Sequence, residues 1–157
     1  MSAATVNELQ KELATLPTKR LLELCTRLAK YKKENKELLT YMLFEAHDEE
    51  AFIAKTKEET DAQFLDMNKS NLYLAKKSLR KILRIINKNI KYSGKKQTEV
   101  ELRIHYCKKL KDSGIRYDGS PVLLNLYNNQ IVKINSALLT LHEDLQLDFQ
   151  NELLKLI

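Results

Sequence analysis

The stretch AKKSLRKILRIINKNIKYSGKK, residues 75–96, decides the fold because it combines nine lysine or arginine residues, no acid and a regular apolar pattern. Its apolar residues recur three and four positions apart, which is typical of one face of an α-helix. We expect Ser70 to cap this helix, the helix to cover about 71–92, and Gly94 to end it. At about 100° per residue the apolar side chains share one arc, formed by Leu72, Ala75, Leu79, Ile82, Leu83, Ile86 and Ile90.

The cations of this stretch share the opposite face of the predicted helix. No acid lies three or four residues from any of the seven cations between Lys76 and Lys91, so the usual pairing of opposite charges along a helix is absent. A face of this kind is more stable beside an anion. The cations span an arc of about 140° and form one stripe: Lys76, Lys77, Arg80, Lys81, Arg84, Lys88 and Lys91.

Several anions are possible partners of this stripe. The simplest interpretation is a solvated face that the acids of Asp48–Asp66 partly neutralise; the others are an acidic protein, nucleic-acid phosphates and an anionic membrane surface. We find no zinc-finger spacing, no aromatic RNA-binding strand motif and no recognisable helix-turn-helix corner. Tyr73 and Tyr92 flank the stripe and give weak support for base stacking. The choice between an acidic protein and nucleic acid stays open, and we place the acidic protein first.

Charge is segregated along the chain. Residues 69–111 hold 14 basic and 2 acidic side chains, whereas residues 1–68 hold 10 and 13, and residues 112–157 hold 3 and 6. The net charge of +6 therefore comes from two predicted helices between acidic flanks.

Composition predicts an all-α fold. The 157 residues suit one domain, 1–157, and include only three glycines and two prolines, fewer than the turns of a sandwich or barrel need. We expect seven or eight helices in an antiparallel bundle or a short stack of helical hairpins. No window resembles a membrane span or a signal peptide. Two isolated cysteines, Cys25 and Cys107, fit a reducing cytoplasm.

Helix start signals divide the rest of the chain. Thr5–Glu8 and Thr98–Glu101 both have the form of a capping box. Asp48 is a candidate cap before two acids, and Ser120 followed by Pro121 is a strong start signal.

The burial pattern of the first half is also predictable from spacing. The first helix should turn Val6, Leu9, Leu13 and Leu16 inward. The third, about 35–46, carries apolar and aromatic residues on more than one side and should be largely buried. The polar middle of the fourth, residues 55–62, predicts exposure.

The last helix has the most regular apolar stripe in the chain. Spacings of three and four over three heptads keep one face toward a partner helix. The stripe packs either inside the domain or in a two-chain coiled coil, which would make a homodimer; the other helices also need partners, which favours the first. We expect a bend near Glu143 and Asp144. The stripe comprises Leu124, Tyr127, Ile131, Ile134, Leu138, Leu141 and Leu145.

Arg103 breaks the apolar arc of its predicted helix. A charge on such a face must be paired or must extend its stem to water. Glu99 lies one turn earlier and suggests a structural ion pair. The alternative is an anion or partner site in a groove between helices.

No catalytic motif is present. The chain has no glycine-rich phosphate loop and no nucleophile elbow. Glu101 and His105 are four residues apart, whereas a di-iron bundle uses pairs three apart. We expect no cofactor and no metal, and a metal-dependent bundle enzyme remains the remote alternative.

Four segments carry a resemblance: LPTKRLLELCTRLAKYKKENKELLTYML (16–43), KKSLRKILRII (76–86), VELRIHYCKKL (100–110) and LHEDLQLDFQNEL (141–153). Their hydrophobic and charge pattern resembles an uncharacterised group of small bacterial helical proteins, a domain of unknown function. The pattern is also similar to HEAT-like helical hairpins. The resemblance implies an all-helical fold and assigns no activity and no residue role.

The sequence therefore predicts a cytoplasmic, non-catalytic interaction module. Its partner is an acidic protein surface or, as the alternative, nucleic acid bound without sequence specificity. The residues expected to bind this partner are Lys77, Arg80, Lys81, Arg84, Lys88, Lys91 and Arg103.

Overall fold

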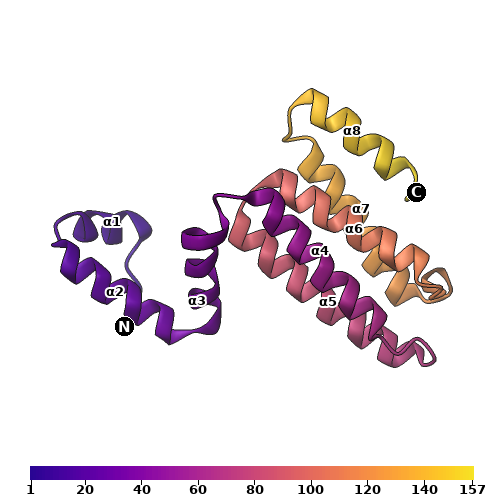
Figure 1. The fold of residues 1–157 in the computed structure, drawn as a ribbon, viewed down its shortest axis with the longest axis horizontal. Coiled ribbons are helices and arrows are strands. Elements are labelled where there is room, and N and C mark those ends of the chain that lie inside the picture. Colours follow the sequence, from indigo (N-terminus) through magenta and orange to yellow (C-terminus); the bar gives the residue numbers. More distant parts are fainter. The chain divides into compact units, whose positions relative to one another are not determined.

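The computed structural model describes residues 1–157 and contains eight α-helices and no strands (Figure 1). The predicted all-α fold of seven or eight helices is confirmed. Contacts divide the chain into two compact units, Met1–Phe44 and Glu45–Ile157. That residues 1–157 act as one domain stays a prediction. None of the helices combines the length and apolar character needed to cross a membrane.

The second unit is built around α6. This helix contacts α4, α5, α7 and α8, and it is buried on several sides. Because four helices cover it, α6 forms the centre of the hydrophobic core. The unit comprises α4 (Glu49–Leu65), α5 (Leu72–Ser93), α6 (Lys96–Asp112), a 3₁₀ turn (Tyr117–Gly119), α7 (Pro121–Leu138) and α8 (Glu143–Leu154).

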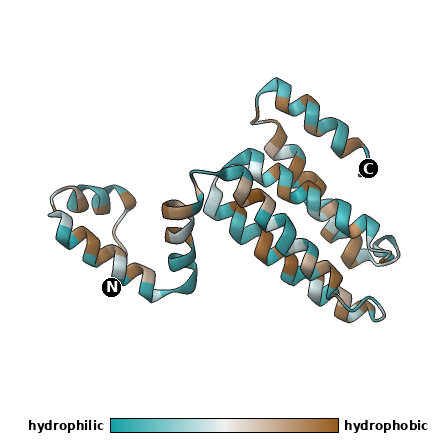
Figure 2. Cartoon of the chain, viewed as in Figure 1, coloured by the Kyte–Doolittle hydropathy of each residue, from teal (hydrophilic) through white to brown (hydrophobic).

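Helix α5 has the two faces that its sequence predicts. Six residues of the predicted apolar arc are buried, and only Leu72 is exposed. Burying one leucine or isoleucine contributes about 1.5–3 kcal/mol, so this face holds the helix on the core. The alternating hydropathy along α5 is visible in Figure 2.

The predicted C-terminal end of α5 is confirmed, whereas the predicted N-terminal cap is wrong. Gly94 ends the helix in the left-handed conformation, with φ 67°, which a side chain would strain. At the start, Asn71 and not Ser70 is the cap, because its Oδ1 accepts a hydrogen bond from the Tyr73 N–H at 2.8 Å. Ser70 instead donates its hydroxyl to Asn68 at 2.6 Å.

The predicted capping box at Thr98–Glu101 is wrong. Helix α6 already begins at Lys96, and Thr98 is fully buried inside its first turn. The Thr98 hydroxyl donates to the Glu49 carboxylate of α4 at 2.6 Å. The Thr98 side chain, which the local pattern predicts to cap α6, therefore bonds to a different helix instead.

Most of the stripe of the last predicted helix packs inside the second unit, but its first residue, Leu124, is exposed. Tyr127, Ile134 and Leu138 are buried, and α7 makes its main contact with α6. The helix does not run through: α7 ends at Leu138 and α8 begins at Glu143, close to the expected bend. Of the two alternatives for this stripe, the burial supports packing inside the domain. The two-chain coiled coil, and with it the homodimer, stays a prediction.

The first unit contains helices with little burial. The capping box at Thr5 is confirmed, since the Thr5 N–H donates to Glu8 and the Glu8 N–H donates to Thr5. The predicted inward face is wrong, because Val6, Leu9 and Leu13 are exposed. The helices are α1 (Val6–Ala14), α2 (Thr18–Tyr31) and α3 (Lys33–Thr40), followed by a π-helical turn (Tyr41–Glu45).

The expected burial of residues 35–46 is also wrong in part. Met42, Leu43 and Phe44 are exposed, and Tyr41 alone in this segment is buried. Three short helices offer too little partner surface to enclose an apolar face, as is general for units of this size.

Candidate functional site

The cation stripe of α5 lies on the surface of the second unit. Five of the six α5 cations expected to bind a partner are exposed, and the sixth, Lys88, is half-buried. None of the five has a carboxylate oxygen within 4.0 Å of its side-chain nitrogens. The chain therefore leaves these charges uncompensated on an exposed face. The five are Lys77, Arg80, Lys81, Arg84 and Lys91.

Asp61 of α4 pairs with α6 and not with α5. Asp61 lies 2.6 Å from the His105 Nε2 and 3.1 Å from the Lys109 Nζ. Lys57 donates to Glu101 at 3.2 Å. No acid of α4 lies within ion-pair distance of the five exposed stripe cations, so the α5 stripe stays open.

The prediction that residues 55–62 are exposed is wrong in part. Lys55, Glu58, Glu59 and Ala62 are exposed, but Thr56 and Thr60 are buried. Each donates its hydroxyl to a backbone carbonyl one turn earlier, Thr56 to Phe52 at 2.9 Å and Thr60 to Thr56 at 2.8 Å. Because the hydroxyls are satisfied locally, a polar segment can pack against the core.

Glu49 joins the start of α4 to the turn between α5 and α6. Its carboxylate accepts hydrogen bonds from the Ser93 and Thr98 hydroxyls and lies 3.2 Å from the Lys95 Nζ. Residues from three helices therefore meet at one acid, and the α5–α6 turn is held in place beside the cation stripe.

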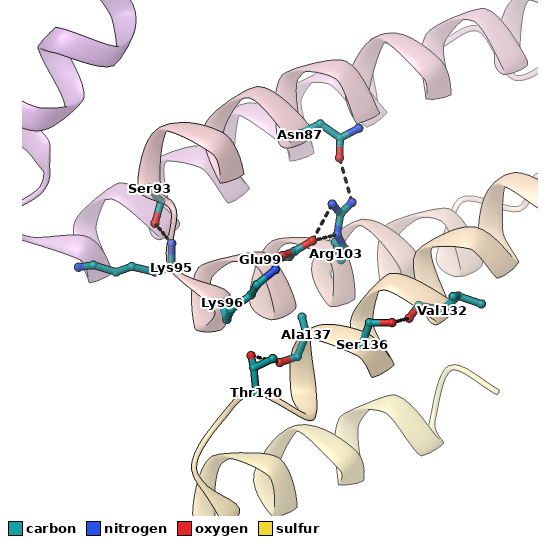
Figure 3. Close-up of polar contacts among 10 residues, drawn as sticks. All are labelled: Asn87, Ser93, Lys95, Lys96, Glu99, Arg103, Val132, Ser136, Ala137 and Thr140. Carbon is teal, nitrogen blue, oxygen red and sulfur yellow. Dashed lines mark hydrogen bonds and ion pairs between the residues drawn. The ribbon is translucent and has the colours of Figure 1, made fainter. Parts of the chain in front are cut away.

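Arg103 forms a buried network that links α5, α6 and α7, and Figure 3 shows its contacts with Asn87 and Glu99. Its side chain donates to Glu99 at 3.0 Å, to the Asn87 Oδ1 at 2.9 Å and to the Gln130 Oε1 at 2.8 Å. Only 5% of Arg103 is exposed. The geometry agrees with the structural ion pair expected from the sequence, because its partners lie within the fold.

Glu99 is also shared with Lys96, whose Nζ lies 2.9 Å from its second carboxylate oxygen (Figure 3). Burial by itself raises the pKa of Glu99, but hydrogen bonds and charge from Lys96 and Arg103 outweigh burial and lower that pKa overall. The carboxylate therefore stays ionised and keeps Arg103 in place.

Two hollows border the stripe. The first, about 210 Å³, lies between Tyr73 and the cations Lys76, Lys77, Arg80 and Arg84. The Tyr73 ring is 68% exposed, so an aromatic face stands beside four positive charges. Such a combination can hold an anionic group together with a flat or apolar one.

The second hollow, about 470 Å³, gathers cations that sequence reasoning did not join to the stripe. Lys91 of α5 faces Lys95 and Lys96 of the α5–α6 turn and Lys133 of α7, with Arg103 and Glu99 beside them. Lys133 is the only cation of α7. A single lysine forms no pattern in the sequence, so the sequence does not indicate that Lys133 lies next to α5. Its position there follows from the packing of α7 beside α5.

The groups proposed for chemistry do not converge. No cluster of three or more histidine, cysteine, aspartate or glutamate side chains is arranged to hold a metal ion. Burial raises the pKa of the Cys107 thiol to about 12, which keeps it protonated and unreactive. Cys107 is therefore not an activated nucleophile.

Comparison with models of protein families, with curated proteins and with solved structures finds no match to this chain. The resemblance to small bacterial helical proteins stays a prediction.

Proposed function

We propose that this protein is a non-catalytic interaction module that binds an acidic protein surface through the exposed cations of α5. The observation that carries the proposal is the unpaired stripe, since five exposed cations have no carboxylate partner in the chain and Asp61 of α4 pairs instead with Lys109 of α6. Cytoplasmic action and the absence of catalysis are part of the same proposal.

The cations of the stripe repel one another, and an anionic partner would reduce this repulsion. The six α5 cations include three pairs spaced four apart and three spaced three apart. Like-charge pairs at these spacings each destabilise a helix by about 0.2–0.5 kcal/mol, so the total is on the order of 1–3 kcal/mol at low salt. This free energy adds to the attraction when an anion binds.

A second candidate partner is nucleic acid bound without sequence specificity. Tyr73 favours it, because an exposed ring beside cations is the usual arrangement for stacking a base of a single strand. Only one such ring borders the stripe, whereas several are typical of single-strand binding. The acidic protein therefore stays first.

The test compares three labelled polyanions by fluorescence anisotropy at about 50 and about 200 mM salt: poly-glutamate, a DNA single strand and a DNA duplex of similar charge. We expect poly-glutamate to bind at least as tightly as the strand, and affinity to fall as salt rises. Tighter binding of the strand or duplex would transfer the proposal to nucleic acid. No binding of any probe at low salt would refute it.

The location of binding is tested with two triple variants of equal charge change. R80E/K81E/R84E reverses the stripe, whereas K69E/R116E/K155E reverses three exposed cations elsewhere in the second unit, none with an ion pair. The stripe variant should lose at least tenfold in affinity and the control less than threefold. Equal losses would show that binding follows net charge alone and would contradict a site on α5.

A further inference from the structure

A groove of about 540 Å³ runs between α5 and α7 beside the stripe. Its α5 wall holds Arg80, Leu83 and Asn87. Its floor includes Gln130, which Arg103 holds from below through a hydrogen bond of 2.8 Å. The same arginine binds Asn87, so one buried side chain fixes the spacing of the two walls.

The α7 wall presents amides at a regular spacing. Asn125, Asn129 and Lys133 are four residues apart on this wall, and all three are exposed. Neither asparagine side chain makes a hydrogen bond within the chain. Asparagine lowers helix stability relative to alanine, so the helix carries these amides without any internal contact that explains them.

We propose that this groove binds an extended acidic segment of a partner protein, with the Asn125 and Asn129 amides hydrogen-bonded to its backbone; this inference rests on the proposed function. Residues four apart on a helix are separated by about 6 Å along the axis. Alternate residues of an extended chain are about 6.6 Å apart. An asparagine amide both donates and accepts, so each can pair with the N–H and C=O of one residue, which lie on the same side of an extended chain.

Charge and apolar surface favour this occupant. Arg80 at one end of the groove and Lys133 at the other can each receive a carboxylate, and neither has an ion pair in the chain. Between them, Val122 and Val132 are exposed apolar lips, and Leu126 is half-buried. The groove thus has cations at its ends and apolar contacts between them.

Other polymers fit this groove less well. A helical segment has no free backbone groups for the two amides, because its own hydrogen bonds use them. No aromatic side chain lines the groove, so a nucleic-acid base has no stacking surface. From Val122 to Lys133 the wall rises about 16 Å, which corresponds to about five extended residues.

The probes are capped octapeptides in which glutamate alternates with valine, leucine, threonine or serine. A second set carries N-methyl groups on alternate peptide nitrogens, which keeps the charge and removes the donors. The variant N125A/N129A removes the two amides while alanine preserves the helix. The control N128A/N151A removes two exposed asparagines outside the groove.

We expect the tightest unmethylated octapeptide to lose about tenfold in affinity with N125A/N129A, which corresponds to about 1.4 kcal/mol. N-methylation should cause a similar loss with the wild type, and N128A/N151A should change affinity less than twofold. Poly-glutamate binding to the stripe should remain within twofold in both variants.

Two results overturn the inference in different ways. If N125A/N129A binds the octapeptides as well as the wild type while poly-glutamate still binds, the groove is not the site and the proposed function stands. If neither the octapeptides nor poly-glutamate binds the wild type at low salt, the proposed function fails and the inference fails with it.

Discussion

Replacing Arg103 with methionine removes the centre of the network between α5, α6 and α7. The change leaves Glu99 with only Lys96 and leaves the Asn87 and Gln130 oxygens without their donor. Removing one partner of a buried ion pair costs about 3–5 kcal/mol. Because Lys96 still holds Glu99, we expect the lower end of this range, a loss of about 3 kcal/mol in the free energy of unfolding.

The assay is urea unfolding of R103M followed by circular dichroism, together with a thermal melt. A loss of about 3 kcal/mol should lower Tm by about 12 °C for a unit of this size. R103M should still bind poly-glutamate within twofold of the wild type at a temperature where it is folded. The double variant E99L/R103M should unfold closer to the wild type, because no unpaired acid remains.

The reasoning on Arg103 fails if R103M unfolds within 0.5 kcal/mol of the wild type, which is the range of ordinary surface changes. It also fails if R103M keeps its stability and loses poly-glutamate binding tenfold. The second result would make Arg103 a partner-binding residue, which is the alternative that the sequence analysis left open.

Three further predictions concern other buried groups. Burial lowers the pKa of His105 in the folded state, so the unfolded state binds more protons and the free energy of unfolding should fall as pH drops below about 6.5; H105Q should flatten this part of a urea-unfolding profile, and an unchanged slope would contradict it. In the native protein, Ellman's reagent should modify the exposed Cys25 and should reach the buried Cys107 only after unfolding; reaction of two thiols without denaturant would contradict this. T98V removes the hydrogen bond from Thr98 to Glu49 and should lower the free energy of unfolding by about 2 kcal/mol; a loss under 0.5 kcal/mol would show that Glu49 is satisfied without Thr98.

Local periodicity was sufficient to predict the element that carries the candidate site. The two faces of α5 follow from side-chain spacing, and Gly94 ends the helix because only glycine adopts its backbone conformation without strain. The cations could therefore be placed on one face before any packing was known. The exposure of these cations could not be predicted, because it depends on where the acids of α4 lie.

The errors have tertiary causes. Thr98 has the local form of a cap, but a carboxylate from α4 binds its hydroxyl inside the helix. The middle of α4 has a polar sequence that predicts exposure, yet Asp61 pairs with Lys109 of α6. In both cases a polar side chain found its partner on another helix, and no spacing along one segment reports that partner.

The groove was also beyond prediction from the sequence. Asn125 and Asn129 lie opposite Arg80 only because α5 and α7 both pack on α6. The segment LNLYNN (124–129) has a visible excess of asparagine within a helix. That excess is the sequence signal that could have indicated a binding surface on α7, since asparagine is unfavourable in a helix interior.

The most direct test of the exposed stripe as the binding face is a titration of the ¹⁵N-labelled protein with poly-glutamate, followed by amide chemical shifts. Binding at the stripe predicts that the largest shifts fall on α5 between Lys77 and Lys91, with α8 unchanged. Shifts spread evenly over all lysine-bearing surfaces, or largest on the first unit, would contradict the claim that α5 is the binding face.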